Sequence, residues 1–321
     1  MKKIILLTVL LLSFTANAVS RDLFEQVIIA NVEQSINSAR GISDSIEKNK
    51  IKQAQVLFTQ LIVNWKKVQA TYVLGDLNED FLDTPRYIDI FHGNNEDIKT
   101  QLDLIISVTD DVEYALYKHS HKTINALEYL LFTQDFTNDR IKAMALIMTK
   151  SIQSYLNQIK TAYQKYRVKF IQDEQFSSAI LLNTLVSGTY ALKEWRIGDV
   201  AGMSKKHKGE ADASRGEYAL SKNSVAAILA ILQAHKQVID SPKYKDFGDI
   251  AIKFGATQEI NKTIGYLNQA INQVMQMQEQ DLSDAKGKDL YKSTSQLMQS
   301  YYSSLMNKLG FVSQVLDADG D

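Results

Sequence analysis

The chain has no cysteine among its 321 residues and only two prolines, Pro85 and Pro242. The absence of cysteine excludes disulfides, cysteine nucleophiles and thiolate metal ligands, so the stability of the fold must come from its core. Glycine is also sparse, with 14 residues. Because proline and glycine supply the turns that a sheet protein needs often, their scarcity favours long helices and predicts the all-α class.

The chain also lacks an excess of charge of one sign. Its formal net charge is −1 and its isoelectric point is near 6.5. This gives no electrostatic reason to expect nucleic acid or an anionic membrane as a partner. A metal ion, a small ligand and an envelope protein partner stay open.

The N-terminus has the parts of a secretory signal peptide. Met1-Lys-Lys precedes an apolar run from Ile4 to Phe14, and the small residues of Thr15-Ala-Asn-Ala18 follow. We predict a signal peptide over 1–18, export to the periplasm and a mature chain of 321 − 18 = 303 residues. No later apolar run has the length of a membrane span, so no transmembrane segment is expected after cleavage.

Amphipathic segments predict a series of helices over 21–48, 50–73, 94–107, 110–133, 139–168, 174–197, 214–239, 257–280 and 284–309. Residues 75–93 and 198–216 are predicted to be long loops. Long helices joined by turns are typical of helical bundles. We expect two up-and-down bundles packed side by side, over 19–170 and 171–321, with a possible internal duplication.

Two helix starts carry capping signals. Asp110 and Glu113 have the spacing of a capping box for the helix over 110–133. Asn138 or Asp139 can cap the next helix.

One glutamate lies on a face that should be apolar. Ile124, Leu127, Glu128 and Leu131 recur at the spacing of one helical stripe, so Glu128 points toward the core. A buried carboxylate without a partner costs several kcal/mol, roughly, so it must find donors or cations or take up a proton. The partner of Glu128 is therefore the first functional question.

Two readings of Glu128 are open. His121, Asn125 and Glu128 lie at i, i+4 and i+7, which places imidazole and carboxylate on one helical side, and these groups suit zinc or iron. This predicts metal ligation by Glu128 and His121. Alternatively, Glu128 is a structural acid bonded to an Arg, Lys or Tyr on a facing helix.

A second polar group lies in the segment Arg215-Gly-Glu-Tyr-Ala-Leu-Ser-Lys-Asn-Ser224. Glu217, Ser221 and Ser224 follow i, i+4 and i+7 and form a polar stripe where a helix should begin. Arg215, Glu217 and Ser221 are candidate ligand-binding residues. The alternative is that the serines are capping or surface residues.

Three segments together resemble the imelysin-like family of bacterial envelope proteins. Ala126-Leu-Glu-Tyr-Leu-Leu-Phe132 is similar to the signature helix of that family, Glu217-Tyr-Ala-Leu-Ser-Lys-Asn-Ser-Val225 to a segment of its second half, and Leu309-Gly-Phe311 through Asp319-Gly-Asp321 to its terminus. The resemblance covers almost the whole mature chain. It implies two four-helix bundles with a polar pocket between them that receives Glu128 from one bundle and Glu217 and Ser221 from the other.

The resemblance also suggests three functions. Family members are described as iron-regulated or metal-associated envelope proteins, and some are classed as metallopeptidases. Here, however, Asn125 stands where the signature has histidine and Thr123 where it has glycine. Since asparagine lacks the imidazole nitrogen that holds a transition metal, the signature ligand pair is broken.

We therefore expect a non-enzymatic periplasmic binding protein of iron or metal handling, with Asn125, Glu128, Arg215, Glu217 and Ser221 around the ligand. A metallopeptidase with Glu128 as ligand or general base is the alternative, and a helical scaffold for envelope proteins is the third.

Overall fold

The computed structural model describes residues 18–92 and 96–312. Helices make up most of these residues and no strand occurs among them. The all-α class is therefore confirmed. The predicted signal peptide lies outside the described residues except for Ala18. None of the helices in the described ranges is both long enough and apolar enough to cross a bilayer.

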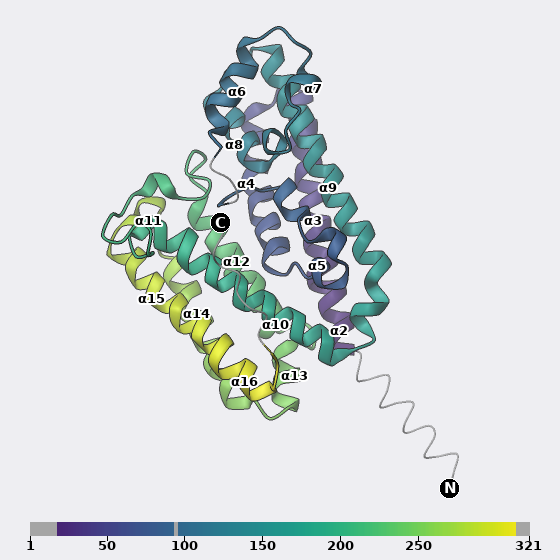
Figure 1. Cartoon of the computed structure of the whole chain (residues 1–321), viewed down its shortest axis with the longest axis vertical. Helices are drawn as coiled ribbons and strands as arrows, with labels where there is room; N and C mark the ends of the chain where they lie inside the picture. The colour runs from purple at the N-terminus through teal and green to yellow at the C-terminus, as the bar shows by residue number, and fades with distance from the viewer. Residues whose placement is uncertain (1–17, 93–95, 313–321) are drawn as a thin grey trace.

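The first half of the protein, residues 18–171, is built around three long helical segments (Figure 1). Its elements are α2 (Ala18–Leu23), the π-helical turn η1 (Phe24–Ile29), α3 (Ala30–Glu47), α4 (Ile51–Ala70), α5 (Leu74–Leu77), the 3-10 turns η2 (Glu79–Phe81) and η3 (Thr84–Tyr87), α6 (Ile98–Ser107), α7 (Val112–Ala115), the 3-10 turn η4 (Ser120–Lys122), α8 (Ile124–Thr133) and α9 (Asp139–Ile171). Helix α3 packs against both α4 and α9.

The second half, residues 174–312, lies beside it and crosses α4 with one of its helices, α12 (Figure 1). Its elements are α10 (Glu174–Ala191), the π-helical segment η5 (Leu192–Gly198), α11 (Asp199–Ala201), the 3-10 turn η6 (Ala213–Arg215), α12 (Ser224–Ile239), α13 (Phe247–Lys253), α14 (Thr257–Val274), the 3-10 turn η7 (Glu279–Ser283), α15 (Ala285–Gln299), the π-helical turn η8 (Ser300–Leu305) and α16 (Met306–Leu309). The division into two bundles stays a prediction.

Two of the predicted helices, over 110–133 and 214–239, are not continuous in the structure, and this changes the geometry of the site. The segment 110–133 is interrupted: Asp111, and not Asp110, caps the short α7, and a separate α8 begins after Thr123, whose hydroxyl accepts from the backbone N–H of Ala126. The segment 214–239 becomes regular helix only at Ser224. By contrast, Asn138 caps α9 as expected, because its side chain accepts from the N–H of Arg140.

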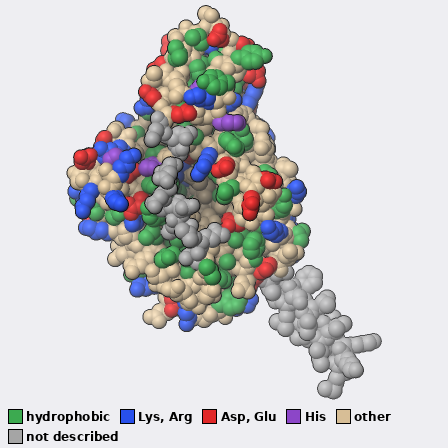
Figure 2. Space-filling view, viewed as in Figure 1, with side chains coloured by type: hydrophobic (Ala, Val, Ile, Leu, Met, Phe, Trp, Pro, Cys, Tyr) green, Lys and Arg blue, Asp and Glu red, His purple; other side chains and the backbone are tan. Residues whose placement is uncertain are grey.

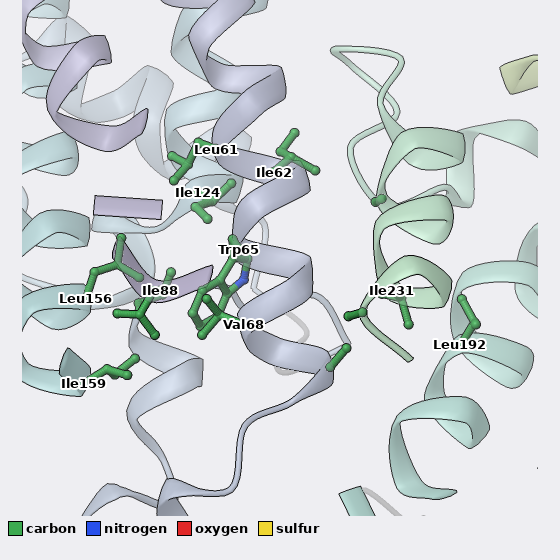
Figure 3. Packing of buried hydrophobic residues seen from close by; sticks show 14 of the residues in the cluster. Leu61, Ile62, Trp65, Val68, Ile88, Ile124, Leu156, Ile159, Leu192 and Ile231 are labelled. Carbon is green, nitrogen blue, oxygen red and sulfur yellow. The ribbon is translucent and has the colours of Figure 1, made fainter. Parts of the chain in front are cut away.

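Helix α4 is the element that both halves share. Its Trp65 is fully buried, with Ile88 and Leu156 on one side of the helix, while Ile231 of α12 lies across from the other side (Figure 3). The buried side chains of α4 face both sets of neighbours, so both must cover the helix to keep water from its apolar residues. Burial of α4 from both sides therefore fixes the second half against the first.

The start of α15 requires a glycine, because the backbone of Leu282 lies close to it. Substitution of this glycine tests the packing at α15. A Cβ built at Gly287 would lie 2.6 Å from the carbonyl carbon of Leu282 and closer still to its oxygen. We expect Gly287→Ala to lower the free energy of unfolding by about 1–3 kcal/mol, because backbone must move to admit the methyl group.

The matched control is Gly265→Ala in the interior of α14, where a Cβ would meet nothing within 4 Å. This change should raise stability by roughly 0.5–1 kcal/mol through helix propensity. Urea denaturation of both variants checks the pair, and equal effects of the two substitutions would contradict the packing at α15.

Candidate functional site

Glu128 meets a residue of the opposite half, and that residue is not a base. The side chain of Glu128 is buried, at 5% exposure. Its Oε1 accepts hydrogen bonds from the backbone N–H of Ser221 at 2.8 Å and from the Ser221 hydroxyl at 2.7 Å. Its Oε2 accepts no hydrogen bond from the described residues and is not among their sealed, unpaired polar atoms. Glu128 therefore has one oxygen engaged and one open.

Ser221 reaches Glu128 because the chain before α12 forms a turn. Tyr218 and Lys222 both have left-handed backbone angles, with φ of 61° and 56°. The N–H of Asn223 donates to the carbonyl oxygen of Tyr218 at 3.1 Å and closes the turn. Left-handed residues other than glycine cost of order 1 kcal/mol each, so tertiary contacts must hold this turn.

A buried charge network provides those contacts. The ammonium group of Lys66 on α4 lies 2.6 Å from Asp89 Oδ2 and 2.5 Å from Glu217 Oε1. The guanidinium of Arg196 donates from Nε to Glu217 Oε2 at 2.7 Å. All four side chains are at least nine-tenths buried. The two positive and two negative charges cancel, which is the condition for burying them.

The network extends to the turn through Tyr218. The Tyr218 hydroxyl donates to Asp89 Oδ2 at 2.7 Å, and the indole N–H of Trp65 donates to the same oxygen at 2.9 Å. Burial alone would raise the pKa of Asp89, but the charge of Lys66 and the hydrogen bonds from Lys66, Tyr218 and the backbone N–H of Phe91 hold it well below its usual range. Asp89 is therefore ionised, and it anchors Tyr218 while Lys66 and Arg196 anchor Glu217.

A cavity of about 670 Å³ opens in front of these groups, between the two halves. Asn125, Glu128 and Tyr129 line it from the first half, and Glu217 and Tyr218 from the second. This is the size of a pocket for a small organic molecule, typically about 300–1,000 Å³. In the view of Figure 2, charged side chains of both signs are scattered over the surface, without a continuous patch of either sign.

The other predicted site residues lie differently. The Oδ1 of Asn125 accepts from the N–H of Ile90. His121 belongs to η4 and not to α8, and its Nε2 lies 2.8 Å from Gln101 Oε1. Burial and Lys118 lower the pKa of His121. The prediction that His121 and Glu128 share one helical face is therefore wrong, because the backbone is extended at Thr123.

Arg215 does not line the cavity. Its guanidinium donates to the carbonyl oxygens of Asp199 and Glu210 and lies 3.8 Å from the carboxylate of Asp212. These contacts fold the loop over 198–216. The predicted helical stripe of Glu217, Ser221 and Ser224 is also wrong, since the first two lie in the turn before α12.

The described donor atoms around Glu128 do not by themselves form a site for a metal ion. Among residues 18–92 and 96–312, no group of three His, Asp or Glu side chains is placed to hold a metal. Catalytic zinc takes three protein ligands and keeps one open position. Glu128 offers one free oxygen, and Glu217 is saturated by Lys66 and Arg196. The amide oxygen of Asn125 is already bonded to backbone.

Lys66 and Arg196 were not identified from the sequence as members of the site, although their positions on apolar helical stripes could have indicated them. Lys66 continues the apolar stripe of Phe58 and Ile62 on α4, and Arg196 follows Leu192 by one turn. A cation on an apolar stripe needs a buried acid in the same way that Glu128 needs a donor. Asp89 lies in a loop without periodicity, so no local pattern marks it.

Removal of Lys66 tests the network. We expect Lys66→Met to lower the free energy of unfolding by about 3–5 kcal/mol, because Asp89 and Glu217 would stay buried with too little positive charge. The neighbouring Lys67→Met is the control: Lys67 is half-buried, forms no ion pair among the described residues, and burial lowers its pKa. That change should stay within about 0.5 kcal/mol of wild type in chemical denaturation. Similar losses for both variants would refute the assigned network.

The pH dependence of stability tests the environment of Glu128. Burial raises the pKa of Glu128, and the hydrogen bonds from Ser221 oppose this without cancelling it. A carboxyl group with a raised pKa in the folded state adds stability below its unfolded pKa, about 4.3, and loses that contribution as pH rises through the folded pKa. The stability of ligand-free Glu128→Gln relative to wild type should therefore increase as the pH rises above the unfolded pKa of about 4.3.

Urea titrations across this range measure the difference. Glu113→Gln, which changes an exposed glutamate on α7, is the control and should show no such trend. A stability difference for Glu128→Gln that is constant with pH, or falls, contradicts the desolvated position of Glu128.

Comparisons with known proteins agree with this architecture. The family model described as imelysin (peptidase M75) matches residues 25–304. A crystal structure of an imelysin-like protein from Psychrobacter arcticum 273-4 superposes with a TM-score of 0.75 at 17% sequence identity, covering 94% of this chain and 98% of that one. No curated protein matches the chain. Because the family model covers most of its length, the chain belongs to the imelysin family.

Proposed function

We propose that this protein is a non-enzymatic periplasmic binding protein that holds a small ligand in the cleft between its two halves. The observation that carries the proposal is the state of Glu128: one oxygen is fixed by Ser221 from the opposite half, and the other is open in a cavity of about 670 Å³. A fixed acceptor with free capacity orients a bound molecule, because its own position costs nothing further on binding.

A role in iron or metal handling is part of the proposal, with the metal as cargo. Since the donors near Glu128 do not gather into a three-ligand site among the described residues, the metal would arrive within an organic complex. The organic part would then make the contacts to the protein. The basic and apolar N-terminal sequence supports export to the periplasm, where such complexes are met.

The alternative of a metallopeptidase has less support. Glu128 as a metal ligand would need two further protein ligands, and His121 is engaged with Gln101. Glu128 as a general base would need a positioned water beside a metal or another electrophile. The third hypothesis, a scaffold for envelope proteins, does not explain a buried acid with an open oxygen.

The test is to identify what the cleft holds. Full-length protein purified from the periplasm should release a small organic molecule on denaturation, detected by mass spectrometry, and any metal should be present in proportion to it. Glu128→Gln should lose at least about nine-tenths of the molecule, because a hydrogen bond to a charged acceptor contributes roughly 1.5–3 kcal/mol. Glu113→Gln should keep it.

Three other results would each point away from the proposal. Stoichiometric metal without an organic partner, lost in Glu128→Gln, would indicate a site formed by the protein alone. Metal-dependent cleavage of peptides would support the peptidase. If the protein retains neither metal nor small molecule, the scaffold for envelope proteins remains as the hypothesis.

A further inference from the structure

The acids around the cleft differ in how far they are satisfied. Both oxygens of Glu217 are bonded to Lys66 and Arg196. Both oxygens of Glu279 accept backbone N–H groups at the start of α12, from Ser224 and Val225. Of the three glutamates that line the cavity, Glu128 alone keeps an oxygen without a hydrogen bond from the described residues.

The bases around the cleft are unsatisfied. Lys99 on α6 and Lys222 in the turn before α12 both line the cavity, one from each half. Both are exposed, and neither forms an ion pair or side-chain hydrogen bond with the described residues. Besides the neutralised Glu217, the described lining therefore carries two lysines without an ion pair and two carboxylates, Glu128 and Glu279, of which only Glu128 keeps an oxygen without a hydrogen bond. A molecule that carries both an anionic group and a hydrogen-bond donor matches this mixture better than a bare cation does.

The rest of the wall is largely apolar or aromatic. Phe91 and Tyr129 line it from the first half and Leu220 from the second. Pockets for small organic molecules have this composition, with an apolar wall and a few polar groups that fix orientation. The charged groups and the apolar wall of the cavity fit a ligand that is anionic at one end, has an apolar body and donates a hydrogen bond at a second point.

We propose that the cleft binds a small organic carboxylate that also carries an ammonium or hydroxyl donor, as α-amino and α-hydroxy acids do. Its carboxylate pairs with Lys99 and Lys222, its donor reaches Glu128 Oε2, and its body packs on Phe91 and Tyr129. This inference rests on the proposed function and names the chemical class of the ligand. A hydroxycarboxylate can in addition hold a metal as cargo.

The experiment uses the full-length chain and a defined set of probes. Isothermal titration is performed with the natural L-amino acids, their α-hydroxy analogues and citrate, and the strongest binder is compared with two truncated forms. One form lacks the carboxylate and the other lacks the donor; for phenylalanine these are phenethylamine and 3-phenylpropionate. We expect each truncation to weaken binding about tenfold or more, as loss of a charge-assisted hydrogen bond does.

Variants assign each contact. Lys99→Gln and Lys222→Gln should weaken binding of the intact acid but leave that of its decarboxylated form unchanged. Glu128→Gln should weaken binding of the intact acid but leave that of the donor-free acid unchanged. Lys205→Gln, at an exposed lysine of the loop over 198–216 that does not line the cavity, is the control and should match wild type.

The outcomes separate this inference from the proposed function. Absence of binding at millimolar concentrations by every probe, or equal binding by the decarboxylated form, overturns the inference. If the periplasmic protein still carries a molecule that depends on Glu128 and that molecule has no carboxylate, the proposed function survives and the inference does not. If nothing is bound through Glu128, both fall.

Discussion

A lysine buried between two carboxylates holds the two halves of this protein in register. Lys66 comes from α4 of the first half, and its partners are Asp89 of the same half and Glu217 of the other. Neither carboxylate could be buried without compensating charge, and each half supplies part of it. Separation of the halves by a small distance would leave charges both unpaired and poorly solvated. The arrangement therefore favours one relative position, in the way that buried polar groups fix register in helical assemblies.

The same network determines the geometry at Glu128. Glu217 and Tyr218 are adjacent in the chain and both are held by buried partners, which fixes the start of the turn that ends at Asn223. Ser221 lies within this turn and meets Glu128 with two hydrogen bonds. The two neighbouring glutamates thus have opposite roles. Glu217 is fully neutralised and acts as structure, whereas Glu128 has no counter-charge at hydrogen-bond distance and stays available.

The sequence predicted part of this site and failed on the rest for identifiable reasons. The helical class follows from periodicity and from the scarcity of proline, and the apolar stripe around Glu128 correctly marked a buried acid that needs a partner. The break between α7 and α8 falls on the polar run from Lys118 to Thr123, which contains no proline or glycine to mark the end of a helix. The turn at Tyr218 was missed because its two left-handed residues are a tyrosine and a lysine, which carry none of the usual turn signals. Its conformation is imposed by contacts from a distant part of the chain.

Asn125 has a structural role beside the charge network. The family resemblance places histidine at this position, where it would be a ligand beside Glu128. Here the asparagine oxygen accepts from the N–H of Ile90, and the N–H of Ile124 donates to the carbonyl of Ile88. These two bonds flank Asp89, so the first turn of α8 holds the loop that supplies the acid to Lys66. An amide side chain has no imidazole nitrogen to bind a metal, and the oxygen of Asn125 already accepts a backbone N–H. Asn125 therefore helps to support the charge network, while one oxygen of Glu128 keeps no hydrogen bond from the described residues.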